Sequence, residues 1–101
     1  MASRELLEND DVRRWFENLA RGSELTADKN LRILARFCRL EDSTPQAVIK
    51  AYRRDRKAFI DRFMDFIEEQ RNGVGNDGKQ RAASYLKEYG VVLSSWVRHH
   101  G

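Results

Sequence analysis

Apolar residues recur at helical spacing along residues 78–100. They form two adjacent stripes that step by three or four residues, as one face of an α-helix requires: Ala83, Leu86, Gly90, Leu93 and Val97, and Tyr85, Tyr89, Val92 and Trp96. A helix that is apolar over so much of its circumference needs neighbours on several sides. We therefore expect residues 78–100 to form the central helix of a small bundle, with Gly90 marking a close helix crossing.

Capping residues mark where earlier helices begin. Asn9 precedes two acidic residues and a helical apolar pattern, so a first helix is expected to start there. Ser23 or Thr26 can cap a second helix that continues to about residue 40. Thr44 followed by Pro45 predicts a third helix, because a capping hydroxyl and a proline at the first helical position both favour a helix start.

The second helix and a fourth one each have an apolar face. The inward stripe of the second helix is Ala27, Leu31, Leu34 and Cys38. Cys38 is the single cysteine, so it cannot form an internal disulfide and is predicted to be a buried packing residue. Asp55 is favoured as the cap of a fourth helix over residues 56–71, although residues 52–55 could also continue the third helix. The inward face of the fourth helix is predicted to hold Phe59, Phe63, Phe66 and Ile67, supported by Ile60 and Met64.

These patterns predict an all-α fold, a compact four- to five-helix bundle, because no window of alternating β-branched residues indicates a strand. The length of 101 residues allows one domain, so residues 1–101 are interpreted as a single domain, with residues 1–9 as a disordered tail. Residues 72–78 contain three glycines and are the expected loop. No apolar run approaches the roughly 18 residues of a membrane span, and the start has no hydrophobic signal region, which predicts a soluble cytoplasmic protein with no membrane partner.

The net charge of +3 is unevenly distributed along the chain. Residues 21–39, 50–57 and 78–101 sum to +3, +4 and +3, whereas residues 1–20, 40–49 and 58–77 are acidic. This segregation favours one basic face, and in such a domain a basic face favours nucleic acid as the partner. From charge alone, a set of solvated helix faces is an equally good interpretation.

Catalytic and metal-binding patterns are poorly supported. His99 and His100 stand at the end of the chain without a cysteine or carboxylate at ligand spacing, so neither a metal site nor a cofactor is predicted. The glycines of residues 72–78 lack the preceding strand that a phosphate-binding loop needs. No acid, base and nucleophile set stands out.

The order of several segments resembles a known family. SELTADKNLRILARFC (residues 23–38) is followed by Thr44 and Pro45, then by a helix ending in DFIEEQ, a glycine-rich turn and a basic helix ending in SSWVRHHG. This order is similar to the N-terminal core-binding domain of the tyrosine recombinases, or phage integrases, of the archaeal-integrase type. Each segment alone is a common helical pattern, whereas their order and spacing over residues 11–101 are more specific.

The resemblance implies a SAM-like bundle that holds one face of double-stranded DNA while a separate catalytic recombinase domain holds the other. In this family the second and last helices approach the DNA. By position, the implied contacts are Lys29, Arg32 and Arg36 on the second helix and Lys79, Arg81, Ser84 and Lys87 on the last. Asp28 departs from the pattern, since it adds a negative charge to a helix meant to approach phosphate.

The resemblance also implies that this chain is not itself an enzyme. The catalytic arginines, lysine, histidines and tyrosine nucleophile of the family belong to a domain that would follow, and Tyr85 and Tyr89 are interpreted as packing residues. The parent protein would then be a prokaryotic cytoplasmic recombinase, oligomeric only on DNA if at all. Two other functions stay open: a helical protein-interaction domain of SAM or death-domain type, and a helix-turn-helix regulator. The last is less favoured because no compact turn precedes a clear recognition helix.

Overall fold

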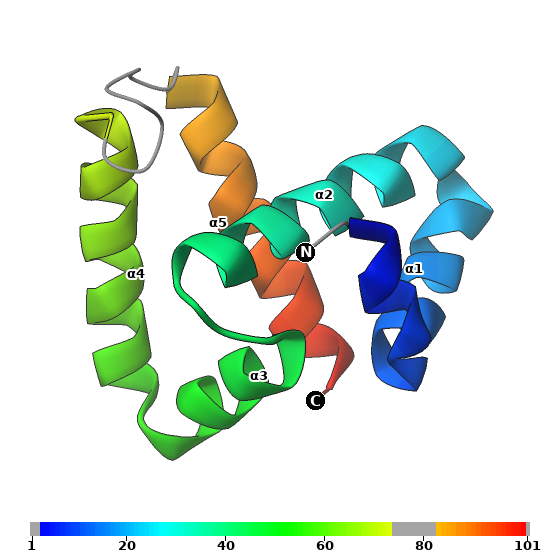
Figure 1. Cartoon of the computed structure of the whole chain (residues 1–101), viewed down its shortest axis with the longest axis horizontal. Coiled ribbons are helices and arrows are strands. Elements are labelled where there is room, and N and C mark those ends of the chain that lie inside the picture. Colours follow the sequence, from blue (N-terminus) through cyan, green and yellow to red (C-terminus); the bar gives the residue numbers. More distant parts are fainter. Residues whose placement is uncertain (1–2, 74–82, 101) are drawn as a thin grey trace.

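Helices make up most of the computed structural model, which describes residues 3–73 and 83–100 (Figure 1). The elements in chain order are a 3-10 helix, η1 (Ser3–Glu8), and the α-helices α1 (Asp10–Gly22), α2 (Glu24–Leu40), α3 (Pro45–Arg54), α4 (Arg56–Arg71) and α5 (Ala83–His99). No strand occurs within these described ranges. The prediction of an all-α helical bundle is confirmed.

The helix starts follow the capping residues read from the sequence. Asn9, Ser23, Thr44 and Asp55 each accept hydrogen bonds through their side chains from backbone amides in the first turn of α1 to α4, at 2.9–3.2 Å. These bonds satisfy amides that have no partner within the helix. Ser23, and not Thr26, therefore caps α2, and the chain does break at Asp55 between α3 and α4.

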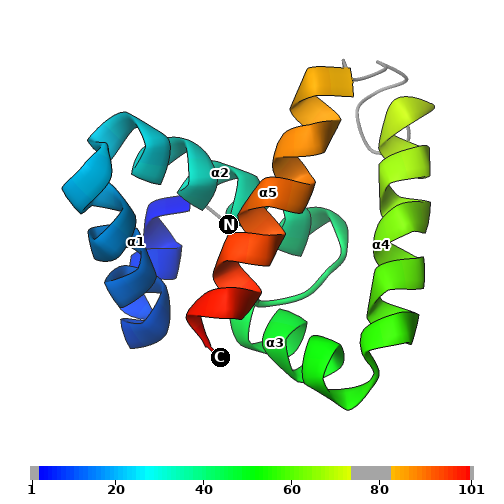
Figure 2. The same cartoon turned by 180° about the vertical axis from the view of Figure 1, so that it is seen from behind.

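Two helices, α2 and α5, cross at the centre of the bundle (Figures 1 and 2). α2 packs against η1, α1, α3 and α5, while α5 packs against α2, α3 and α4. The last helix is thus central, as expected, but it shares that position with α2. α4 lies at the edge of the bundle, on the side away from α1 (Figures 1 and 2).

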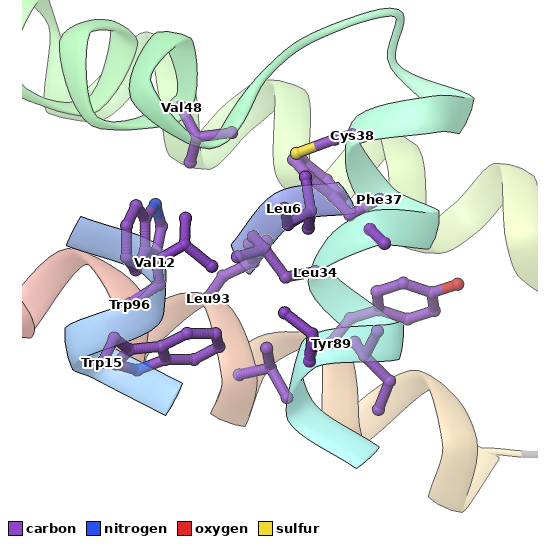
Figure 3. Packing of buried hydrophobic residues seen from close by; sticks show 14 of the residues in the cluster. Leu6, Val12, Trp15, Leu34, Phe37, Cys38, Val48, Tyr89, Leu93 and Trp96 are labelled. Carbon is purple, nitrogen blue, oxygen red and sulfur yellow. The ribbon is translucent and has the colours of Figure 1, made fainter. Parts of the chain in front are cut away.

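Two tryptophans attach the outer helices to α5 (Figure 3). The rings of Trp15 in α1 and Trp96 in α5 meet edge to face, with centroids 5.3 Å apart. The Trp15 indole donates a hydrogen bond to the Ser95 hydroxyl (3.1 Å), and the Trp96 indole donates one to the Pro45 carbonyl (3.0 Å). Because both buried N–H groups are satisfied, these large side chains fill the core without a desolvation cost for an unpaired donor.

Phe66 is the residue that fixes α4 to the rest of the bundle. It is buried, and its ring lies 4.8 Å from that of Phe37 in α2 and 5.0 Å from that of Tyr89 in α5. Tyr89 is 0% exposed, which confirms its interpretation as a packing residue, whereas the side chain of Tyr85 lies outside the described residues. The side of α4 that was predicted to face the core, which includes Phe66, therefore does face it.

Three positions on α4 and α5 show where the sequence prediction was wrong. Ile60 and Met64, expected to support the core, are 47% and 59% exposed. Gly90 was expected to mark a close helix crossing, yet a Cβ atom at this position would have no neighbour within 4 Å. The glycine instead faces open space between α4 and α5. Both errors have one cause. A periodic apolar pattern shows that a helix has apolar sides, but it does not show which of those sides pack against another helix.

The amino-terminal segment is ordered where a disordered tail had been expected. Residues 3–8 form η1, and Leu6 is only 5% exposed within the core cluster. The expectation for residues 1–9 was therefore wrong for this part. The predicted helix start at Gly78 and most of the predicted loop lie outside the described residues. No helix among the residues described has the length and apolarity needed to cross a membrane.

Cys38 provides a simple test of this packing. It is 1% exposed, and burial raises the pKa of its thiol to about 12. Because the thiolate is the reactive form, we expect the native protein to react with a disulfide reagent at pH 8 far more slowly than the urea-unfolded chain. The release of the coloured thiol measures both rates. Equal rates would show that Cys38 is not enclosed by α2 and its neighbours.

Candidate nucleic-acid interface

A narrow basic strip runs along the outside of α2. This helix is buried around most of its circumference, and only residues spaced by three or four positions reach its outer side. Three of them, Lys29, Arg32 and Arg36, form what we call the α2 strip. They lie on one face of one rigid helix, so their spacing does not depend on a loop.

Lys29 connects the α2 strip to α5. Its ammonium nitrogen lies 3.3 Å from a carboxylate oxygen of Glu88, in the first half of α5. Both side chains are partly exposed, so the pair contributes little to folding stability and can be exchanged for another partner. The contact brings together two basic segments that are far apart in the sequence, although Glu88 also adds a negative charge at their junction.

The two arginines of the α2 strip differ in how far their side chains are exposed to solvent. Arg32 is exposed, whereas Arg36 is half-buried. The Nε atom of Arg36 is buried and finds no acceptor among the described residues. An unsatisfied donor of this kind is costly. Arg32 is therefore the better placed of the two to reach a ligand in solvent.

The last helix contributes fewer defined positions. Lys87 is exposed on the outer side of α5, beside Glu88 in the chain. Ser84 is the second residue of α5, but its side chain is not among the described ones. Lys79 and Arg81 lie outside the described residues altogether. The structure thus places Lys29, Arg32, Arg36 and Lys87 on adjoining helices, and the DNA contacts assigned to all seven residues stay predictions.

A second basic surface, which we call the basic corner, lies where α3 ends and α4 begins. Its five exposed cationic residues are Lys50, Arg53, Arg54, Arg56 and Lys57. Arg53 donates a hydrogen bond to the His100 carbonyl, and the guanidinium of Arg56 lies 5.0 Å from the centre of the Tyr52 ring. The charge of +4 over residues 50–57 was visible in the sequence, but the family resemblance directed the site assignment to other helices.

The end of α5 carries the two histidines of the chain. The rings of His99 and His100 lie 5.2 Å apart, but the described residues contain no group of three side chains that could hold a metal ion. Burial lowers the pKa of His100, whose ring packs 4.3 Å from that of Trp96. The neutral imidazole is therefore favoured in the folded state, and it serves as a packing group.

The α2 strip and Lys87 offer hydrogen-bond donors and positive charge, which suit recognition of an anionic surface. Comparisons with protein-family models, with curated proteins and with solved structures found no match to this chain. The functional assignment therefore depends on the residues and their geometry.

Proposed function

We propose that this chain is a DNA-binding domain that holds duplex DNA against the α2 strip and the first half of α5. One observation carries the proposal: α2 and α5 pack together, and the contact of Lys29 with Glu88 shows that the outer side of α2 lies beside the first half of α5, although nearly 60 residues separate the two in sequence. A pair of helices at a fixed spacing can follow a phosphate backbone, whereas separate flexible charges cannot. The resemblance to recombinase core-binding domains names the same two helices.

Phosphate contacts would supply most of the affinity. Arg32 offers a planar guanidinium that can donate two parallel hydrogen bonds to one phosphate, and Lys87 offers a compact charge one helix away. Lys29 would exchange its Glu88 partner for a phosphate. The carboxylate of Glu88 would then repel the backbone, which helps to fix where the duplex lies. Ser84 is the candidate for reading a base edge, since a hydroxyl on a helix in the major groove can reach one.

The role within a larger protein is proposed from the family resemblance. The domain would position a recombination site for a separate catalytic domain of a prokaryotic tyrosine-type recombinase, in the cytoplasm, where it would hold one face of the duplex. Chemistry would belong to that other domain.

A titration of labelled duplex DNA at several salt concentrations tests the proposal. Phosphate neutralisation releases counterions, so the logarithm of the binding constant should fall linearly with the logarithm of salt concentration, with a slope near −0.9 for each contact. A protein-interaction domain of SAM or death-domain type would bind little duplex even at low salt. That outcome would reject the proposal.

The absence of chemistry has its own test. Because the described residues adjoin no catalytic set, the isolated chain should neither nick nor become covalently attached to a duplex that carries a strand break designed to trap a tyrosine adduct. Denaturing gel electrophoresis with a labelled strand measures both products. An adduct that maps to Tyr85 or Tyr89 would overturn their assignment as packing residues.

A further inference from the structure

α4 carries apolar residues on more of its surface than the bundle covers. Phe66 faces the core, but Ile60 and Met64 lie on a second side and are 47% and 59% exposed. Half-buried Ile67, one turn further on, packs against the core cluster. We call Ile60 and Met64 the α4 stripe. A helix that is apolar on two sides normally packs between two partners, and among the described residues α4 has neighbouring helices on one side only, at the edge of the bundle (Figures 1 and 2).

An open apolar groove adjoins the α4 stripe. It has a volume of about 500 Å³ and lies between α4 and α5, with walls that include Ile60, Phe63, Gly90 and Val97. Gly90 leaves its wall of the groove open, since a Cβ atom built there would meet no atom of the described residues within 4 Å. An apolar side chain from outside could therefore enter between α4 and α5 without moving either helix.

The charges of α4 match its own helix dipole only in part. Its first turn contains Arg56 and Lys57 after the Asp55 cap, while Glu68 and Glu69 lie near its end together with Arg71. Glu68 forms an exposed ion pair with Arg71 (3.1 Å), and such a pair is weak enough to exchange partners. Cations at the amino end and carboxylates towards the carboxyl end are each unfavourable within one helix. The same arrangement becomes favourable when a second α4 lies beside the first in the opposite direction, because each basic end then meets an acidic end.

We propose that the α4 stripe is a self-association surface on which α4 of a second copy packs antiparallel. With a twofold axis between Ile60 and Met64, Ile60 contacts the partner's Met64 above the groove, and Lys57 lies beside the partner's Glu68. Each contact occurs twice, as a twofold interface requires. A second copy is favoured over another partner because this chain itself supplies the apolar stripe and both complementary charges.

The dimer should be weak, because one helix pair buries less than a stable interface does. This surface is separate from the α2 strip, and the inference does not depend on DNA binding. It departs from the sequence-based expectation that copies associate only on DNA. If the association exists, it would favour paired copies wherever the local concentration is high, as at neighbouring binding sites.

Sedimentation equilibrium of the full chain without DNA is the first test. An interface below about 1,200 Å² is expected to associate weakly, so the experiment needs protein concentrations between roughly 20 µM and 1 mM. Over this range the mean mass should rise from the monomer value of 11.9 kDa towards twice that value. Met64→Asp should abolish the rise, because it would place a carboxylate in the apolar contact. Its thermal midpoint should stay close to that of the wild type, since Met64 is exposed.

Charge reversal separates this dimer from other modes of association. Lys57→Glu and Glu68→Lys should each weaken the dimer by about tenfold, since each change makes two like-charged pairs, and the double variant should restore it. Lys57 and Glu68 are both exposed, so either single change should leave the thermal midpoint nearly unchanged, although Glu68→Lys also removes the exposed pair with Arg71. A wild-type chain that stays monomeric at the highest concentration contradicts the proposal. So does a dimer that survives Met64→Asp, or a double variant that fails to recover.

Discussion

Leu34→Ala is expected to lower the free energy of unfolding by about 3 to 5 kcal/mol. Leu34 is 0% exposed and lies in the middle of α2, among the helices that this central element joins. Removing its side chain loses the burial of three carbon atoms and leaves a cavity that rigid neighbours cannot close. Urea unfolding followed by circular dichroism gives the change from the shift in midpoint at constant slope.

Leu93→Ala is the matched comparison for this prediction. Leu93 is 4% exposed, but it also lines the groove between α4 and α5, so solvent can reach part of the space that its side chain leaves. We expect a loss of about 2 kcal/mol, at the lower end for such substitutions. If Leu93→Ala costs more than Leu34→Ala, or if Leu34→Ala costs less than about 1 kcal/mol, the assignment of α2 as the enclosed centre is wrong.

Replacing Lys29, Arg32 and Lys87 together by alanine should weaken duplex DNA binding on the order of 100-fold at about 0.1 M salt. The salt slope should also fall by about 2.7, since each lost phosphate contact removes roughly 0.9. All three residues are exposed, so the thermal midpoint should change little. Fluorescence anisotropy with a labelled duplex measures affinity and slope in one experiment.

The control removes the same charge from another helix. Arg13, Arg14 and Arg21 are exposed on α1, and Arg13 already lies 2.8 Å from a carboxylate oxygen of Asp10. Replacing these three by alanine should cost much less affinity, because the charges lie away from the proposed contact surface. An equal loss in both triple variants would mean that the attraction is diffuse and that the proposed surface has no special role.

Much of the fold could be predicted from local chemistry. Asn9, Ser23, Thr44 and Asp55 carry short polar side chains that cap a helix, and each does so in the structure. The break before α4 could be predicted because a new helix start leaves backbone amides without a partner in the helix, and the side chain of Asp55 can accept a hydrogen bond from one of them. These signals depend only on residues within one turn, so a single sequence contains them.

The errors concern contacts between elements. Leu6 was assigned to a disordered tail, because nothing near it shows that α1 and α2 leave a place for its side chain. Gly90 was assigned to a close crossing, although glycine can equally leave a gap, and only the direction of α4 decides between the two. The same holds for Ile60 and Met64, whose periodicity is helical but whose side of α4 has no neighbour in the described chain.

The candidate site stays a prediction, although the sequence could indicate part of its arrangement. The sequence and the family resemblance named the α2 strip and Lys87, and these residues do lie on adjoining helices. Two features could not be anticipated from spacing: the contact of Lys29 with Glu88, which joins residues on different helices, and the buried Nε of Arg36. The basic corner was visible as a run of charge, but a run of charge does not tell which face a ligand prefers.

Backbone amide NMR spectra of the labelled chain, recorded during a titration with duplex DNA, test the proposed surface most directly. The account predicts that the largest shift changes fall on the outer side of α2, around Lys29 and Arg32, and on the first half of α5, around Lys87. Amides of α1 and of the α4 stripe should change little. Changes concentrated instead at the basic corner, or spread evenly over all helices, would contradict the assignment of the α2 strip and α5 as the DNA-binding surface.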